Sequence, residues 1–372
     1  MLNRRSGKLV PVVRVATFNA AMNRANDGEL LAELRGGRSA QAARIAEIVQ
    51  RVGADVLLVC ELDRDRAAET ARVFAKEYLA VSQRGQAPID FEYVWADEVN
   101  TGVPSGEDLD ADGKVGGPGD AFGYGAFPGQ YGMALLSRHP ILVDRIRTFR
   151  TLRWSAMPGA LRPPGMSDAA WNVARLSSKS HWDVPVGIGK QLVHVLCSHP
   201  TPPVFDGPED RNGRRNHDEI RFWVDYLTPE RAGWIVDDAG HAGGLATDAA
   251  FVLMGDFNCD PADGDARREA LLELLAHPRV QDPRPRGAAG DTMAKEQWGT
   301  NSTHAGDPAL DTSDFPDAPG QGPGNLRVDY VLVDKQLAVA QSGVFWPLPR
   351  QPGGDLVDAS DHRLVFVDIE AR

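Results

Sequence analysis

The chain has 372 residues and a formal net charge of −12, from 40 Lys and Arg against 52 Asp and Glu. Its composition is that of a folded globular protein, and its apolar runs, such as Val56 to Cys60, are too short to span a bilayer. The three cysteines exclude a disulfide framework, and the acidic balance disfavours a broad basic face for nucleic acid.

Short apolar runs alternate with amphipathic segments along the chain, which is typical of a layered α/β protein. The run from Asp55 to Cys60 is apolar throughout, as expected of a strand buried on both faces, and Gly53 is a plausible stop for the helix before it. Strands are predicted at 12–19, 55–60, 132–136, 141–143, 192–197, 251–254, 328–333 and 364–369. Helices are predicted at 45–52, 64–78, 220–227 and 271–275.

Two segments break this pattern. Residues 100–130 contain nine glycines and three prolines, and a second irregular stretch covers 282–325. Loops of this length are usually functional or disordered, so we expect the first of them to form a rim of a binding cleft. Residues 211–219 are also predicted to be a loop, and Arg215 and His217 within it are candidates for binding a substrate phosphate.

Several predicted strands end in a carboxylate, an amide or an imidazole, and ligands of layered α/β folds bind beyond strand ends. Carboxylates and amides suit a hard cation such as Mg²⁺, and histidines beside them suit proton transfer or stabilisation of a charged oxygen. The set therefore indicates metal-assisted hydrolysis of a phosphate ester. Its members are Asn19, Glu61, His199, Asp256, Asn258, Asp329, Asp361 and His362.

Six short motifs in order resemble the endonuclease/exonuclease/phosphatase superfamily, whose members share the pancreatic-deoxyribonuclease-like fold. They are Thr17-Phe18-Asn19, Cys60-Glu61, Ser198-His199-Pro200, Gly255-Asp256-Phe257-Asn258, Arg327-Val328-Asp329-Tyr330 and Ser360-Asp361-His362. Because the first and last motifs belong to one site, the resemblance implies a single domain over 1–372, not the two or three domains that length suggests. The implied architecture is a four-layer α/β sandwich, in which two mixed β-sheets pack face to face and are flanked by helices.

The resemblance also implies a metal site. Glu61 would be the main ligand of Mg²⁺, or of Mn²⁺ in its place, with Asn19 nearby and Asp361 as a further ligand or outer partner. A metal held by one or two carboxylates and by the substrate would offset the charge that builds on the phosphate.

The catalytic roles follow from the same resemblance. Asp256 would orient or deprotonate the attacking water, and Asn258 would hold a non-bridging phosphate oxygen. His362 would stabilise the developing charge while Asp329 fixes its orientation, as a carboxylate does behind a histidine in a triad. His199 is the histidine that deoxyribonuclease-like and sphingomyelinase-like members have at this position, whereas abasic-site repair members carry a different residue.

Two weaker features remain open. Asp108, Asp110 and Asp112, followed by Gly113, begin like a calcium loop, but Gly119 stands where a bidentate Glu is expected, so either Ca²⁺ or a solvated acidic loop fits. Additional candidates for substrate contacts, beside the loop residues named above, lie near the motifs. They are Tyr131, Lys179 and His181.

Three longer segments resemble a bacterial branch of the superfamily that is described as phosphatase-like or phytase-like and is often exported. They are 105–113, 127–133 and 216–223. Residues 1–10 contain no long apolar stretch typical of a secretory leader, so a cytoplasmic location is the default and export of a longer precursor is the alternative.

We therefore expect a monomeric, metal-dependent phosphoesterase, with a small or lipid-linked phosphoester as substrate. A non-specific nuclease is the second interpretation, and it needs a groove lined by Arg and Lys that the sequence does not show. A non-catalytic binding module is the third, and it is disfavoured because Glu61, Asp256 and His362 are all present.

Overall fold

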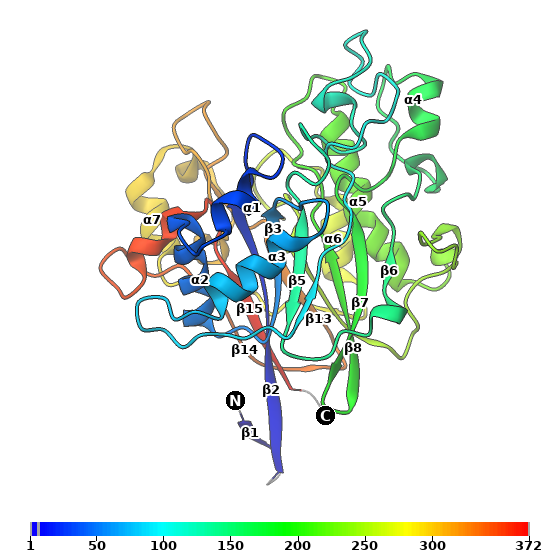
Figure 1. Ribbon diagram of the computed structural model, residues 1–372. Helices are drawn as coiled ribbons and strands as arrows, with labels where there is room; N and C mark the ends of the chain where they lie inside the picture. The colour runs from blue at the N-terminus through cyan, green and yellow to red at the C-terminus, as the bar shows by residue number, and fades with distance from the viewer. Residues whose placement is uncertain (1, 6–7, 371–372) are drawn as a thin grey trace.

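The computed structural model describes residues 2–5 and 8–370, with side chains from Val12 onward. Part of the N-terminal segment that we assessed for a leader lies outside the described residues. Two large β-sheets form the centre of the molecule (Figure 1).

The first sheet is mixed, because β2 and β3 run parallel whereas the other pairs are antiparallel. β1 (Leu2–Arg5) pairs only with the start of β2. The remaining order is β14 (Ala338–Val344), β15 (Val365–Glu370), β2 (Lys8–Met22), β3 (Val56–Leu62), β5 (Met133–Ser137) and β4 (Tyr93–Trp95).

The second sheet is also mixed, since β8 and β9 are its parallel pair. Its order is β10 (Val280–Gln281), β13 (Asp329–Asp334), β9 (Ala250–Asp256), β8 (Gln191–Ser198), β7 (His181–Ile188) and β6 (Arg147–Thr148). A separate two-stranded ribbon joins β11 (Ser313–Asp314) to β12 (Asn325–Leu326).

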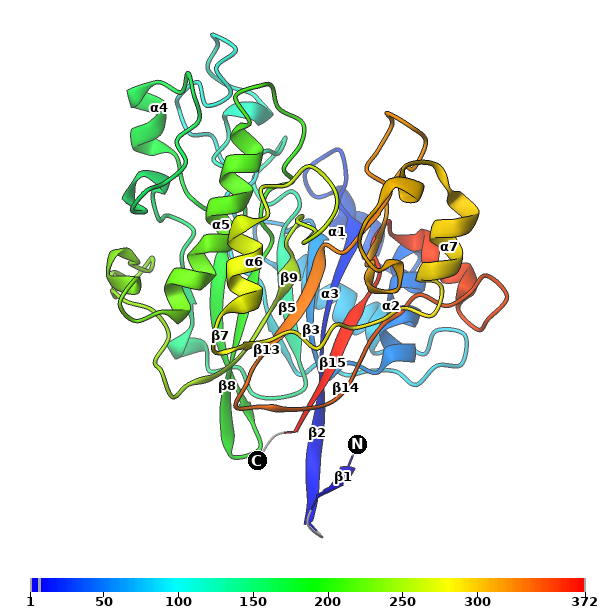
Figure 2. The ribbon, with the colours of Figure 1, turned by 180° about the vertical axis from the view of Figure 1, so that it is seen from behind.

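Helices cover the outer face of each sheet (Figures 1 and 2). α2 illustrates how the sequence sets their ends, because Ser39 accepts a hydrogen bond from Ala42 at its start and Gly53 adopts φ 73° at its end. The α-helices are α1 (Glu29–Leu34), α2 (Ala40–Val52), α3 (Glu69–Phe74), α4 (Asp168–Val173), α5 (Arg211–Leu227), α6 (Glu269–Ala276) and α7 (Gly290–Gln297).

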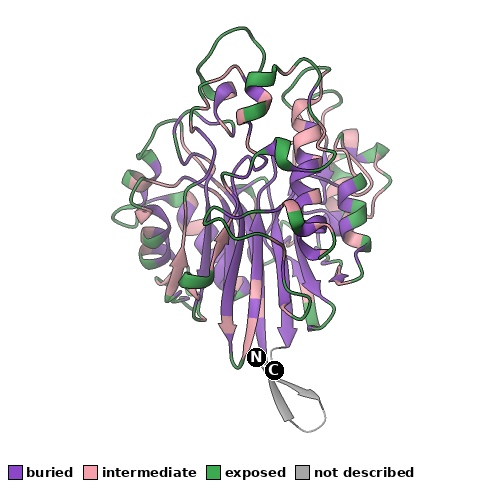
Figure 3. Ribbon diagram, turned by 90° about the vertical axis from the view of Figure 1, so that its right-hand side faces the viewer, coloured by how far each residue is buried: buried purple, intermediate pink, exposed green. Residues whose placement is uncertain are grey.

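The side chains of the central strands alternate between two apolar cores. On β3, Val56 and Leu58 enter the core between the two sheets, whereas Leu57 and Val59 pack under α1, α2 and α3. The strands of the second sheet divide in the same way between the central core and the core beneath α5 and α6. The central strands are accordingly buried along their length (Figure 3). The predicted four-layer sandwich of two mixed sheets is confirmed.

Three local predictions were wrong in extent. Residues 211–219 form the first half of α5 and are not a loop. Their polar character misled the prediction, because Asn216, Asp218 and Glu219 are buried and use their side chains to bind neighbouring N–H and C=O groups. Residues 141–143 make an isolated bridge and a 3₁₀ turn instead of a strand. The helix expected from Arg64 begins only at Glu69, since the side chain of Asp65 binds the N–H of Ala67 and of Thr70. It continues beyond Phe74 as a π-helical turn.

The two ends of the sandwich differ. The described ends of the chain lie together at one end, and the long loops, including the 100–130 insert, gather at the other (Figure 1). The 282–325 segment is less irregular than predicted, because it contains α7 and the β11–β12 ribbon. Among the described residues, no helix is both long and apolar enough to cross a membrane.

Candidate active site

Strand register brings the predicted site residues together at the loop-bearing end of the sandwich. Asp256 on β9 pairs directly with Asp329 on antiparallel β13, so their carboxylates lie beside each other. Asn19 pairs with Cys60 across the parallel strands β2 and β3, and Glu61 follows at once. The residues are far apart in sequence, but they share one edge of the two facing sheets.

Gly255 is required by the close approach of β8. A Cβ atom at this position would collide with the carbonyl oxygen of Ser198. The absence of a side chain therefore allows the end of β8, and His199 after it, to lie against Asp256.

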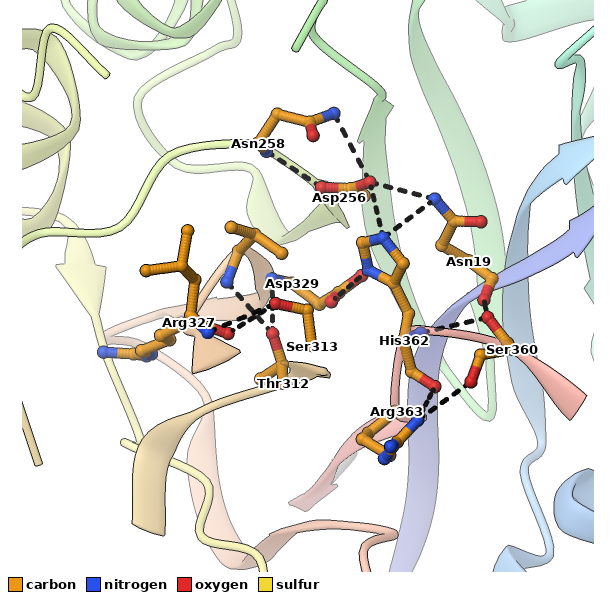
Figure 4. Close-up of polar contacts among 12 residues, drawn as sticks. Asn19, Asp256, Asn258, Thr312, Ser313, Arg327, Asp329, Ser360, His362 and Arg363 are labelled. Atoms are coloured by element: carbon orange, nitrogen blue, oxygen red, sulfur yellow. Dashed lines mark hydrogen bonds and ion pairs between the residues drawn. The ribbon is translucent and has the colours of Figure 1, made fainter. Parts of the chain in front are cut away.

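The carboxylate of Asp256 is the centre of the site (Figure 4). It accepts hydrogen bonds from Nδ2 of Asn19 at 3.0 Å and from the backbone N–H of Asn258 at 2.8 Å. Nε2 of His199 lies 3.3 Å from it, although without the angle of a hydrogen bond. Burial alone would raise the pKa of Asp256, but His362 and His199 outweigh burial and hold that pKa well below its usual range. Asp256 is therefore a buried carboxylate at neutral pH.

His362 is held in its charged form. Its Nδ1 donates to Asp329 at 2.8 Å, and its Nε2 lies 3.4 Å from Nδ2 of Asn19. Burial by itself would lower the pKa of His362, whereas the carboxylates of Asp329 and Asp256 raise the pKa to about 10. An imidazolium at this position can stabilise negative charge on a substrate oxygen.

Two hydroxyl groups fix this histidine–carboxylate pair. Thr312 accepts hydrogen bonds from the N–H groups of Val328 and Asp329, and Ser360 accepts from the N–H of His362 while it donates to the carbonyl of Asn19 (Figure 4). The sequence analysis missed Thr312, which belongs to no motif and reaches the site through a loop. Ser360 was visible as the first residue of the last motif, but its link to Asn19 was not.

Glu61 lies at the open side of the site in a strained backbone. It has φ 55°, and its two carboxylate oxygens accept from Nδ2 of Asn19 at 3.1 Å and Nδ2 of Asn23 at 2.8 Å. Asn258 also has a positive φ, of 50°. Non-glycine residues in this region carry strain that surrounding structure must overcome, and such residues cluster at functional sites. The role of Asn23 was not predicted, since it follows the first motif without belonging to it.

The residues present fit a divalent cation. The carboxylates of Glu61 and Asp256, to both of which the amide of Asn19 donates, supply oxygen atoms of the kind that Mg²⁺ and Mn²⁺ prefer. Among the described residues, both ring nitrogens of the buried His199 and Oδ1 of Asp329 find no hydrogen-bond partner. This is unusual for buried polar atoms and indicates that the site is completed by a ligand. One possible ligand atom from each of Asp256, Asp329 and His362 also lies within 4.8 Å of the other two, but the charged His362 has no lone pair to offer. Asp361 is exposed beside them, and its role as a ligand stays a prediction.

A cavity of about 560 Å³ opens beside Glu61. Its walls come from the 100–130 insert, the segment from Trp154 to Lys179, and residues 201–215. Among the five residues predicted to contact substrate, the structure places three on this cavity: Tyr131, Lys179 and Arg215. Residues of the 100–130 insert belong to the cavity wall, which agrees with the expectation that the insert forms a rim.

His181 and His217 lie elsewhere, so we do not carry them into the proposed site. His181 is fully enclosed, with its Nε2 on the carbonyl oxygen of Glu219 at 2.9 Å and its Nδ1 on the hydroxyl of Ser177. His217 contacts Asp218 on the side of α5 away from the cavity lining.

The buried state of His181 predicts that the protein loses stability in mild acid. Burial lowers the pKa of His181 to about 3, against about 6.5 in an unfolded chain. Between these values the unfolded chain binds a proton that the folded chain refuses, so this histidine lowers the free energy of unfolding as the pH falls from 6.5 toward 3, by up to about 1.4 kcal/mol per pH unit. Urea unfolding at pH 7 and pH 5 should show a smaller fall in His181→Gln than in the wild type. An equal fall in both proteins would contradict this assignment.

The acidic loop differs from its predicted form. Oxygen atoms of Asp108, Asp110 and Asp120 lie within 4.8 Å of one another, whereas Asp112 is not part of this group. Asp120 is buried and accepts from the N–H groups of Leu109 and Gly116, both at 2.7 Å. These hydrogen bonds explain the folding of the loop, and the binding of Ca²⁺ there stays a prediction.

Comparison with known proteins identifies the family. A model of the endonuclease/exonuclease/phosphatase family matches residues 16–362, and the chain belongs to this family. The most similar solved structures that we report are at most 19% identical and therefore speak to the fold alone. A search of the curated proteins gave no significant match.

The first two of the following three structures illustrate the shared fold. An endonuclease/exonuclease/phosphatase from Beutenbergia cavernae has a TM-score of 0.53 at 19% identity, over 96% of this chain and 71% of that one. A family protein from Leptotrichia buccalis has a TM-score of 0.50 at 16% identity, over 96% and 100%. Sphingomyelinase C from Streptomyces griseocarneus has a TM-score of 0.48 at 16% identity, over 96% and 99%.

Proposed function

We propose that the protein is a metal-dependent phosphoesterase that hydrolyses a phosphomonoester or phosphodiester by in-line attack of water. The observation that supports this most is the buried Asp256 carboxylate between Asn19, Asn258 and two histidines. The site holds a carboxylate and an imidazolium in fixed positions. Such an arrangement suits hydrolysis of a phosphoester, in which negative charge moves from the attacking oxygen to the leaving oxygen.

In this proposal, Asp256 accepts a hydrogen bond from the attacking water and takes its proton as the bond from oxygen to phosphorus forms. The low pKa of Asp256 makes it a weak base, so orientation of the water is its larger contribution. The bond from phosphorus to the ester oxygen breaks, and that oxygen leaves with the bonding electrons and is protonated by solvent.

The phosphoryl oxygens are the proposed targets of the remaining groups. The amide of Asn258, which now donates to the carbonyl of Pro200 at 3.1 Å, lies next to Asp256 and would hold a non-bridging oxygen. The imidazolium of His362 would stabilise the charge that develops there, with Asp329 as its positioning residue. Mg²⁺ or Mn²⁺ bound by Glu61, with Asn19 and Asp361, would supply Lewis-acid stabilisation of the same charge.

A panel of substrates tests this function. Bis(4-nitrophenyl) phosphate, 4-nitrophenyl phosphate, a short-chain phospholipid, RNA and supercoiled plasmid should be compared with Mg²⁺, with Mn²⁺ and with EDTA. We expect metal-dependent turnover of a small or lipid-linked ester. Nicking of plasmid at low enzyme concentration would favour a nuclease, and no turnover of any ester with metal would contradict the proposal.

The metal assignment makes a separate prediction. Glu61→Gln removes the charge of one ligand but keeps its shape, so we expect Mg²⁺ affinity to fall by at least the roughly 10–100-fold that follows loss of outer partners at metal sites. Calorimetric titration with MgCl₂ measures this, with Glu69→Gln on the surface of α3 as the matched control. Equal affinity in Glu61→Gln and the control would remove Glu61 from the ligand set.

A further inference from the structure

The cavity beside Glu61 is a built site and not a surface depression. Its volume of about 560 Å³ falls within the range of roughly 300–1,000 Å³ that is usual for small-molecule sites. Glu61 and Lys179 both line it, so one end of the cavity is continuous with the candidate active site. A phosphoester bound at Glu61 has therefore to place one of its substituents in this space.

The charge of the lining is opposite to that of the whole chain. The protein carries a net charge of −12 overall, yet the described residues of the lining include four cationic side chains and a single acid, Glu61, at the metal end. The cations are Arg175, Lys179, Arg211 and Arg215. Two of them belong to the first turns of α5, a helix of 17 residues whose positive dipole end adds to their field. The cavity thus attracts a negatively charged group.

Lys179 is the most informative of these residues. Only 6% of its surface is exposed, and its ammonium makes no hydrogen bond or ion pair within the described part of the chain. Burial lowers the pKa of Lys179 below its ordinary value, and the carboxylates of Glu219, Glu61 and Asp256 oppose this shift without cancelling it. Burying a charge without a partner is expensive, so a lysine in this position indicates an anion that is present when the protein works.

The arginines are fixed in place but keep donors free. The guanidinium of Arg215 donates to four backbone carbonyls through Nε and Nη2, and no partner in the described chain takes up its Nη1. Arg211 donates through Nη1 to the carbonyl of Leu109 at 2.9 Å, and Arg175 through Nη1 to Asn100 at 2.6 Å. Such anchoring pre-organises the remaining N–H groups for an anionic ligand.

Five of the other described residues that line the cavity are aromatic. The walls include Phe122, Tyr131 and Trp154. The centre of the Phe122 ring lies 3.8 Å from the guanidinium carbon of Arg175. Tyr124 and Phe205 are 65% and 90% exposed and belong to the same lining. Flat rings of this kind favour a planar apolar group over a flexible chain.

We propose that this cavity binds the organic part of the substrate, and that the substrate is a compact phosphoester that carries a planar ring and a second anionic group. Lys179 contacts the phosphate that is hydrolysed, and the arginine-lined wall contacts the second anion. The inference rests on the proposed phosphoesterase function, because it assumes that the reacting phosphate lies at Glu61. It excludes polymers and long acyl chains as preferred substrates.

Two chromogenic diesters that share a leaving group test the second anion. They are the 4-nitrophenyl ester of thymidine 5′-phosphate and the same compound with an added 3′-phosphate. Bis(4-nitrophenyl) phosphate, which has a second nitrophenyl ring in place of the nucleoside, serves as the reference without a nucleoside. We expect kcat/KM to be at least about 10-fold higher for the compound with the 3′-phosphate than for the one without it. Arg211→Met should bring this ratio close to one, because it removes a side chain that is proposed to contact the 3′-phosphate. A 10-fold ratio corresponds to about 1.4 kcal/mol.

Arg214→Met is the matched control, because Arg214 lies on the same helix, does not line the cavity, and donates to the carbonyl of Glu209. It should keep the wild-type ratio. Binding supplies a readout besides turnover. Thymidine 3′,5′-bisphosphate, titrated by calorimetry into the full chain in EDTA, should bind about 10-fold more weakly to Lys179→Met and to Arg211→Met than to wild type and Arg214→Met.

The outcomes separate the two proposals. If none of the diesters is hydrolysed with Mg²⁺ or Mn²⁺, the proposed function fails. If they are hydrolysed but the 3′-phosphate gives no advantage, or Arg211→Met and Arg214→Met behave alike, the phosphoesterase function stands and the inferred substrate class is wrong. Faster hydrolysis of a short-chain phospholipid than of either nucleotide diester would also overturn the inferred substrate class.

Discussion

His362→Ala should lower kcat/KM for a small phosphodiester by about 10³-fold. The imidazolium lies 3.7 Å from Asp256, and removal of one pre-organised donor from a developing oxyanion costs about 10²–10³ in rate. Loss of its contribution to the charge balance around Asp256 and Asp329 adds to this effect. Steady-state kinetics with bis(4-nitrophenyl) phosphate measures it, with circular dichroism to establish that the variant is folded.

A matched histidine exists outside the site. His194 on β8 also bonds a buried aspartate, with its Nδ1 2.6 Å from Asp183. His194→Ala should therefore lose some stability while it retains kcat/KM within a few-fold of wild type. Comparable losses of activity in the two variants would show that His362 has a structural role and no special catalytic one.

Asp329→Asn should lower kcat/KM by about 10²-fold, and should have little further effect once His362 is absent. In the proposed mechanism Asp329 does not contact the substrate. It acts through the 2.8 Å hydrogen bond to His362, which fixes the orientation of the ring and favours its charged form. Residues that act as one unit show strongly non-additive losses, so the double variant should resemble His362→Ala.

A double-mutant cycle with kcat and KM resolved separately measures this coupling. The loss in Asp329→Asn should lie in kcat, since an interaction made mainly in the transition state is weakened. Asp329→Glu, which keeps the charge, should recover part of the rate. Additive losses in the cycle would mean that the two residues contribute independently.

Much of the fold could be predicted because its strands are simple in sequence. The central strand β3 is apolar on both faces from Val56 to Cys60, and Glu61 of the candidate site follows near its end. The antiparallel pairing of β9 and β13 places Asp256 directly opposite Asp329. For this reason the strand-end motifs were sufficient to predict residues that the folded chain brings together.

The remainder depends on contacts that no local pattern records. Thr312 and Asn23 reach the site from loops, and only the folded chain shows that they bind the backbone of Asp329 and the carboxylate of Glu61. The polar start of α5 was mistaken for a loop because its buried polar side chains satisfy backbone groups of other segments. His181 was proposed to bind substrate from its position beside Lys179, yet alternation along β7 turns it into the core.

Hydrolysis of bis(4-nitrophenyl) phosphate in ¹⁸O-labelled water, with Mg²⁺ and with EDTA, tests the central claim most directly. The account predicts metal-dependent release of 4-nitrophenol and one ¹⁸O atom in the 4-nitrophenyl phosphate produced, because water attacks phosphorus and the phosphorus–oxygen ester bond breaks. Asp256→Asn should abolish most of this turnover under the same conditions. Turnover that is equal with EDTA and with Mg²⁺, or ¹⁸O found in the nitrophenol, would contradict metal-dependent attack of water at phosphorus.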